Sequence, residues 1–176
     1  MATSTYPSMA SQNPLTQLIA HSALKVAQAG ATVLPPAYLV SSLILRRGTG
    51  FSVRGLMRSA NMAVLGGGAL GAGAAWVRLR GASAESLEDR VFRLSHSTSQ
   101  VHVDDYSFIG SALSAVVIPA IFLKRAPLPS LVTGGASVGL GVGSWTHIAG
   151  MFSQGKDVRP EGMVGELPVV GGNNKP

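Results

Sequence analysis

The chain has 176 residues, of which 46% are hydrophobic and only 12% are charged, so it leaves no room for a separate soluble domain beside its apolar segments. With 22 glycines and no cysteine, it is also poorly suited to a core of large side chains and cannot hold disulfides, iron–sulfur clusters or thiolate zinc sites. The net charge of +6 comes from single or paired cations at the ends of apolar segments. This pattern predicts anchoring to phospholipid headgroups and not nucleic-acid binding.

The N-terminal region predicts a tail followed by a short helix. Residues 1–12 are rich in Ser, Thr and Ala and favour a flexible tail, and the absence of Lys and Arg before Lys25 argues against a secretory signal or a transit peptide. Asn13 and Pro14 form a helix start, with Asn as the N-cap and Pro in the first turn. Apolar residues then recur every three or four positions, which indicates a short amphipathic helix along the membrane interface.

Four uncharged stretches follow, each long enough to cross a hydrocarbon layer of about 30 Å at about 1.5 Å per residue. The expected spans cover residues 26–45, 59–77, 106–123 and 128–151. We therefore predict an all-α integral membrane protein with four transmembrane helices. Residues 13–155 form its membrane domain, and residues 156–176, rich in Gly and Pro, form an extended tail.

The first expected span carries Pro35 and Pro36 near its middle, and two residues without N–H groups predict a kink. The carbonyl groups left without donors must meet protein or water and not lipid, so a neighbouring helix should cover them. The alternative is two half-helices that form a re-entrant hairpin.

Small residues recur every four positions in the second and fourth spans. Such stripes let helix backbones approach closely in lipid, so we interpret them as helix-packing residues and not as a phosphate-binding loop. They are Ala63, Gly67, Gly71, Ala75, Gly135, Gly139 and Gly143.

The connection between the second and third spans is the one long polar segment. Ser83 is expected to cap a short helix on which Asp89 and Arg93 form an i,i+4 pair. Asp104 or Asp105 is expected to cap the third span.

The orientation of the spans follows from the charges of the loops. The first and third connections carry six cations and no acid, whereas the middle connection carries four cations and five acids. The positive-inside rule then places both termini on the side opposite the two basic loops. The expected membrane-interface anchors are Arg46, Arg47, Arg58, Arg78, Lys124 and Arg125.

The candidate chemistry is sparse. His96, His102, Asp104 and Asp105 are the cluster most able to bind a metal, but their spacing fits no common zinc template, and we expect no metal site. His147 lies within the fourth span and is interpreted as a structural residue.

Catalysis is not expected from this sequence. A nucleophile–base set is not evident, and we expect neither catalytic residues nor a cofactor. No Asp, Glu, Lys or Arg lies inside an expected span, which argues against a proton relay. Ser111, Ser114 and Ser137 are expected to form hydrogen bonds between helices.

Two segments, STYPS…QNPLTQLIAHSALKVAQAG and EDRVFRLSHSTSQVHVDDYSFIG, resemble the small accessory membrane subunit of fungal mitochondrial complex I, the NUXM type. The resemblance covers most of the chain and involves no catalytic motif. It implies a multi-pass subunit of the mitochondrial inner membrane that supports assembly or stability of NADH:ubiquinone oxidoreductase without a cofactor. Its partners would be other membrane subunits of complex I and phospholipids, and both termini would face the intermembrane space.

Two alternatives stay open. The translocase superfamily related to the inner-membrane import channels is similar in its four glycine-rich spans, although the linker signature between its second and third spans is not clearly matched here. A stand-alone lipid-binding or channel-forming protein is the third class.

Overall fold

The computed structural model describes residues 13–45, 50–95 and 98–153, and these residues fold into helices without a β-strand. The all-α prediction is confirmed. The elements in chain order are α1 (Pro14–Val40), the π-helical turn η1 (Ser41–Leu45), α2 (Val53–Leu79), α3 (Ala84–Ser95), α4 (Thr98–Phe122) and α5 (Leu128–Ser153).

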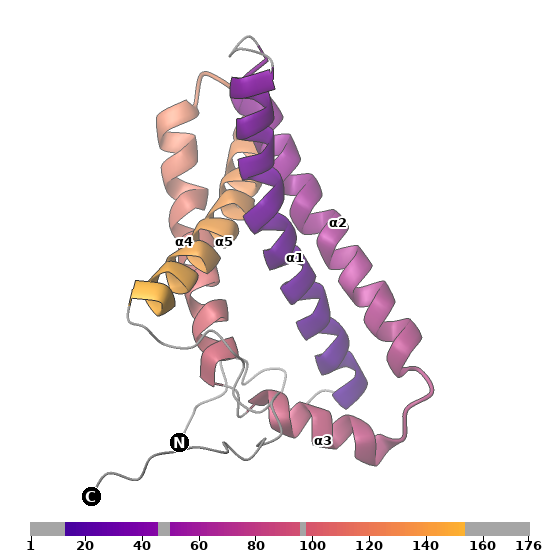
Figure 1. The fold of residues 1–176 in the computed structure, drawn as a ribbon. Helices are drawn as coiled ribbons and strands as arrows, with labels where there is room; N and C mark the ends of the chain where they lie inside the picture. Colours follow the sequence, from indigo (N-terminus) through magenta and orange to yellow (C-terminus); the bar gives the residue numbers. More distant parts are fainter. Residues whose placement is uncertain (1–12, 46–49, 96–97, 154–176) are drawn as a thin grey trace, which may run out of the picture.

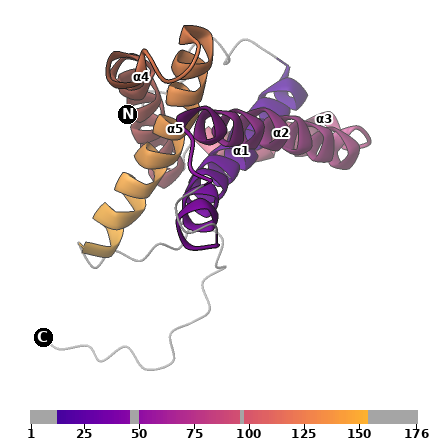
Figure 2. The same cartoon turned by 90° about the horizontal axis from the view of Figure 1, so that it is seen from above.

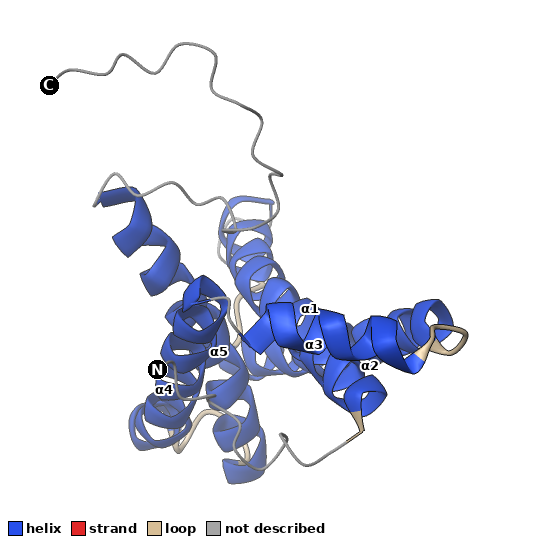
Figure 3. Ribbon diagram, turned by 90° about the horizontal axis from the view of Figure 1, so that it is seen from below, coloured by secondary structure: helices blue, strands red, loops and turns tan. Residues whose placement is uncertain are grey.

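The four long helices form two antiparallel hairpins. In Figure 1, α1 packs along α2, and α4 packs along α5. The view from above in Figure 2 shows that the two hairpins cross and that α5 provides the contact between them. The short helix α3 joins the hairpins and lies across one end of the bundle, as Figures 1 and 3 show.

The start of α1 was predicted correctly, but the division of this region into two helices was wrong. Asn13 caps the helix, because its side-chain oxygen accepts a hydrogen bond of 3.0 Å from the Leu15 N–H. The helix then runs without a break through Lys25, since residues 25–29 contain no helix breaker. The expected interfacial helix and the first half of the expected span are therefore one element.

The other predicted boundaries shift toward the N-terminus. Ser52 caps α2, its side chain accepting a 3.0 Å hydrogen bond from the Gly55 N–H, so α2 begins before the expected span. The expectation that Asp104 or Asp105 caps the third span is wrong, because α4 begins at Thr98 and both carboxylates lie within the helix. For α5, the helix nearly coincides with the expected span.

The predicted details of α3 are present in the structure. The Ser86 N–H donates to the Ser83 hydroxyl oxygen at 3.4 Å, and Arg93 pairs with Asp89 at 2.9 Å on the exposed side. The apolar face of α3 places Leu87 in a buried cluster with Ala75 and Leu79 of α2. Partly buried leucines near the start of α1 pack against the same cluster, so α3 closes this end of the first hairpin.

Two helices are long and apolar enough to cross a membrane, namely Val53–Leu79 and residues Gln100–Phe122 of α4. Within the described residues, α1 and α5 do not meet the same criterion of length and composition.

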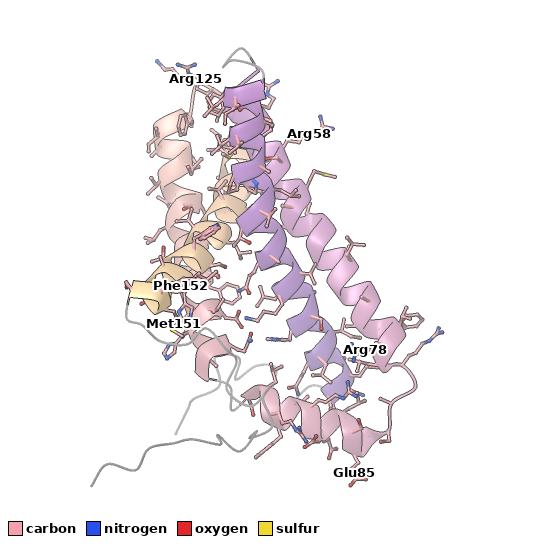
Figure 4. All side chains as sticks on the ribbon, in the orientation of Figure 1. Arg58, Arg78, Glu85, Arg125, Met151 and Phe152 are labelled. Carbon is pink, nitrogen blue, oxygen red and sulfur yellow. The ribbon has the colours of Figure 1, made fainter. Side chains whose placement is uncertain are left out.

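The basic and acidic connections lie at opposite ends of the bundle. Figure 4 shows Arg58 and Arg125 at one end and Arg78 and Glu85 at the other. The remaining anchor Lys124 is exposed beside Arg125. Arg46 and Arg47, the two expected tails and His96 lie outside the described residues.

Candidate functional site

The most unusual group of the described fold is the carboxylate of Asp104 on α4, whose side chain is only 4% exposed. The Lys25 ammonium on α1 donates to its Oδ1 atom at 2.6 Å, and the Gln28 amide donates to the same oxygen at 2.7 Å. Lys25 and Gln28 lie three positions apart and therefore share one face of α1. The buried carboxylate is thus paired with a charge and hydrogen-bonded, as burial requires.

This group was not predicted, because Lys25 and Asp104 were both expected to lie at helix ends. The statement that the spans contain no charge depends on those boundaries, and both residues lie well inside α1 and α4. Asp104 also lies within the apolar segment Gln100–Phe122. A signal was present in the sequence, since Lys25 and Gln28 form a polar pair at helical spacing among apolar residues.

His21 lies one turn before Lys25 on α1 and belongs to the same polar region. The spacing of four residues places the side chains of His21 and Lys25 on the same face of α1.

Aromatic rings lie close by, between α4 and α5. His147 of α5 stacks on His102 of α4, with 6.5 Å between ring centroids, and Tyr106 tilts against it at 5.6 Å. These contacts give His147 a packing role. In the parts of the chain that the structure describes, no three His, Cys, Asp or Glu side chains gather to hold a metal ion.

Hydroxyl groups and an amide join the helices elsewhere. Ser107 and Ser144, both buried, share a 2.8 Å hydrogen bond between α4 and α5 that was not predicted. Ser137 donates to Asn61 of α2 at 3.1 Å, which confirms one of the three predicted interhelical serines. Among the described residues, Ser111 and Ser114 form no such bond.

The proline pair of α1 leaves two carbonyl groups without their usual helical donors, those of Ala31 and Thr32. The helix continues through the pair, so the re-entrant alternative is wrong. Helix α5 covers both carbonyls, because the Trp145 indole N–H donates to the Thr32 oxygen at 3.1 Å and Gly141 lies directly against the Ala31 oxygen. The prediction that a neighbouring helix covers this site is confirmed.

The small-residue stripe of α2 faces α1. A Cβ atom on Gly67 would lie 2.7 Å from the Val26 carbonyl oxygen, and one on Gly71 would lie 2.5 Å from the Ser22 carbonyl oxygen. Ala63 and Ala75, the outer members of the stripe, are buried. Ala63 lies against Gly30 of α1, and Ala75 lies in the cluster beneath α3.

The stripe of α5 faces α4 in the same way. A Cβ atom on Gly135 would lie 2.6 Å from the Ser114 carbonyl oxygen. Gly139 lies directly against the Gly110 carbonyl oxygen, and Gly143 lies against that of Tyr106. Gly141, on the opposite side of α5, contacts α1 and was not part of the predicted set.

Comparisons with protein-family models, with curated proteins and with solved structures found no match. In the Asp104 region, the Lys25 ammonium group and the Gln28 amide both donate hydrogen bonds to the Asp104 carboxylate. This chemistry joins helices and holds their spacing.

Proposed function

We propose that the chain is an integral membrane protein in which α1, α2, α4 and α5 all cross the bilayer. The distribution of side chains supports this proposal, because large apolar residues point outward while polar groups pair inside. Leu113, Val116 and Ile121 of α4 are 62%, 73% and 65% exposed, whereas Asp104 and Ser107 are buried. Exposure of such an apolar outer surface to water is unfavourable, whereas its contact with lipid tails is not.

Within that membrane domain, α3 would lie in the plane of the interface. It is short and amphipathic, buries Leu87 against the helix ends and exposes its charged side chains. Such a helix suits the headgroup layer. The exposed cations Arg58, Lys124 and Arg125 at the other end would then contact the phospholipid headgroups of the opposite leaflet.

For the biological role, we propose a non-catalytic accessory subunit of the membrane arm of mitochondrial NADH:ubiquinone oxidoreductase, supporting its assembly or stability. The observation that carries this choice is that the buried polar groups bond to one another, with Asp104 satisfied by Lys25 and Gln28. The resemblance of two segments to the fungal accessory subunit names the complex. We propose the mitochondrial inner membrane as its location, with other membrane subunits and phospholipids as partners.

The test is native gel electrophoresis of membranes extracted with a mild detergent, with an epitope tag on the chain. We expect the tag in a megadalton band that oxidises NADH and expect deletion of the chain to reduce that band. Migration in a smaller complex together with import-channel proteins would support the translocase alternative instead. Migration as a free monomer or homo-oligomer would contradict both readings and favour a stand-alone protein.

A further inference from the structure

The two hairpins are held together unevenly along their length. Their apolar contacts lie toward the end opposite α3, where Met57 of α2 and Leu131 of α5 share a buried cluster. Asn61 of α2 bonds to Thr133 of α5 at 3.1 Å in the same region. On α1, Ala31 and Thr32 make the corresponding contacts with Gly141 and Trp145 of α5, one turn beyond Gln28.

Toward the α3 end, the contact between the hairpins changes in kind. Few backbone contacts join α1 and α4, and the two ribbons diverge in Figure 1. Long side chains cross this distance instead: Lys25 and Gln28 extend from α1 to the single Oδ1 atom of Asp104. The side chain of Lys25 remains 24% exposed, so the bond lies at the edge of the bundle and not at its centre.

Within each hairpin, the two helices stay in contact at this end. Gly67 and Gly71 keep α2 against α1, and Gly143 keeps α5 against α4. Because each pair of helices is packed backbone to backbone, each hairpin can move as a unit about the apolar contacts at the other end. The polar group at Asp104 then sets the angle between two rigid units.

We propose that Lys25, Gln28 and Asp104 form a releasable clasp that holds the two hairpins together at the α3 end. An ion pair is suited to this task because it is strong only when both charges are present and aligned, whereas an apolar contact cannot be released by a change of charge. Loss of the Lys25 charge leaves the buried Asp104 carboxylate with only the Gln28 amide as a partner, and loss of the Asp104 charge leaves the Lys25 ammonium without a counter-ion. Either change favours the separation of α1 from α4 and the hydration of the remaining charge.

The test uses spin-label distances in the full chain reconstituted in nanodiscs, for which the absence of native cysteine is an advantage. One label pair, at Val77 of α2 and Ile109 of α4, reports the α3 end. A second pair, at Met62 of α2 and Leu123 after α4, reports the opposite end. All four positions are exposed, which favours labelling without repacking.

In the Asp104→Asn and Lys25→Met variants, we expect the Val77–Ile109 distance distribution to shift to longer values and broaden, while the Met62–Leu123 distribution stays as in the parent. Asp105→Asn is the matched control, because Asp105 forms no ion pair among the described residues and should leave both distributions unchanged. The exchanged variant Lys25→Asp with Asp104→Lys should restore part of the narrow distribution.

Three results would overturn the clasp. Unchanged Val77–Ile109 distances in both single variants would show that apolar packing alone sets the angle. Equal broadening of both label pairs would indicate general loss of structure and not an opening at one end. A shift produced equally by Asp105→Asn would assign the effect to net charge. None of these outcomes depends on membership in a respiratory complex, so the proposed function is tested separately.

Discussion

At the scale of single residues, the carbonyl of Thr32 lacks its hydrogen bond within α1 and accepts one from α5 instead. Pro36 removes the N–H that would bond this oxygen, and Trp145 of α5 supplies a replacement donor at 3.1 Å. Pro35 likewise removes the N–H that would bond the Ala31 carbonyl oxygen. Because Gly141 has no side chain, the α5 backbone approaches this oxygen closely. The proline pair therefore fixes the register of α1 on α5.

This reading predicts the effect of Trp145→Phe, which keeps an aromatic ring but removes the indole donor. We expect the free energy of unfolding to fall by about 0.5–1.5 kcal/mol, the usual net contribution of one hydrogen bond, because this bond is exposed and not buried. In a Pro36→Ala background, the restored N–H of residue 36 can bond Thr32, so the same Trp145→Phe change should cost clearly less. Denaturant unfolding in detergent micelles measures both steps of this double-mutant cycle, and equal costs in the two backgrounds would refute the assignment.

At the scale of elements, four glycines of α2 form two sets with different surroundings. Gly67 and Gly71 lie against the α1 backbone, whereas Gly66 and Gly73 have open space where a Cβ atom would stand. The first set is required by close packing. The second set only lowers the stability of the helix, because glycine is a poor helix former.

We therefore predict opposite effects from one kind of substitution. Gly71→Ala should destabilise the α1–α2 hairpin, since the new Cβ would approach the Ser22 carbonyl oxygen to 2.5 Å. Gly73→Ala should stabilise it by up to about 1 kcal/mol through helix propensity. The midpoint of thermal unfolding in detergent measures both. If the two variants shift it equally, the stripe does not mark the helix contact.

The elements themselves could largely be predicted from the sequence, because uncharged length, N-caps and small-residue spacing are local signals. Ser83 and the pair of Asp89 with Arg93 were predicted for the same reason. The Asp104 clasp could not be predicted, because the two partners of Asp104 lie 79 and 76 positions away in the sequence. In addition, the sequence does not distinguish a charge at a helix end from a charge inside a helix. Gly141 was missed because it pairs with the Ala31 carbonyl on another helix.

At the scale of the whole molecule, the antiparallel order of the hairpins determines which connections share a side. The α1–α2 and α4–α5 connections lie at one end of the bundle, and α3 lies at the other (Figures 1 and 4). Arg54, Arg58, Lys124 and Arg125 are all exposed at the former end. This asymmetry is the kind that orients polytopic proteins, with the more basic connections on the inner side.

The corresponding prediction is that the basic end faces the matrix and that tags at both termini face the intermembrane space. Protease added to mitoplasts should remove both tags and leave a tag inserted in the 46–49 connection intact. A matrix protein serves as the control for intact inner membranes. Protection of either terminal tag would contradict this orientation or the even number of membrane crossings.

A scaffold and a proton carrier differ in where their titratable groups lie. A relay across a membrane needs titratable groups at successive depths. In the described helices, the titratable side chains within the bundle lie toward its α3 side; they include His21, Lys25, His102, Asp104 and His147. Among the described residues, segments 26–45, 59–77 and 128–146 contain no Asp, Glu, Lys, Arg or His. The titratable groups therefore stop part-way across the bundle, and among the described residues Lys25 and Asp104 are the pair of them that joins the two hairpins.

If that is their role, Asp104→Asn and His147→Gln should change how much complex assembles but not how fast each assembled complex works. We expect Asp104→Asn to reduce the quantity of intact complex, because it removes the negative charge of the ion pair between α1 and α4. We expect His147→Gln to have a smaller effect, because it removes only ring contacts. Quinone reduction normalised to intact complex should stay within about twofold of the parent in both, a small difference on the scale where tenfold corresponds to about 1.4 kcal/mol. A large fall in normalised rate with assembly unaffected would make the altered residue part of the proton pathway and refute the scaffold role.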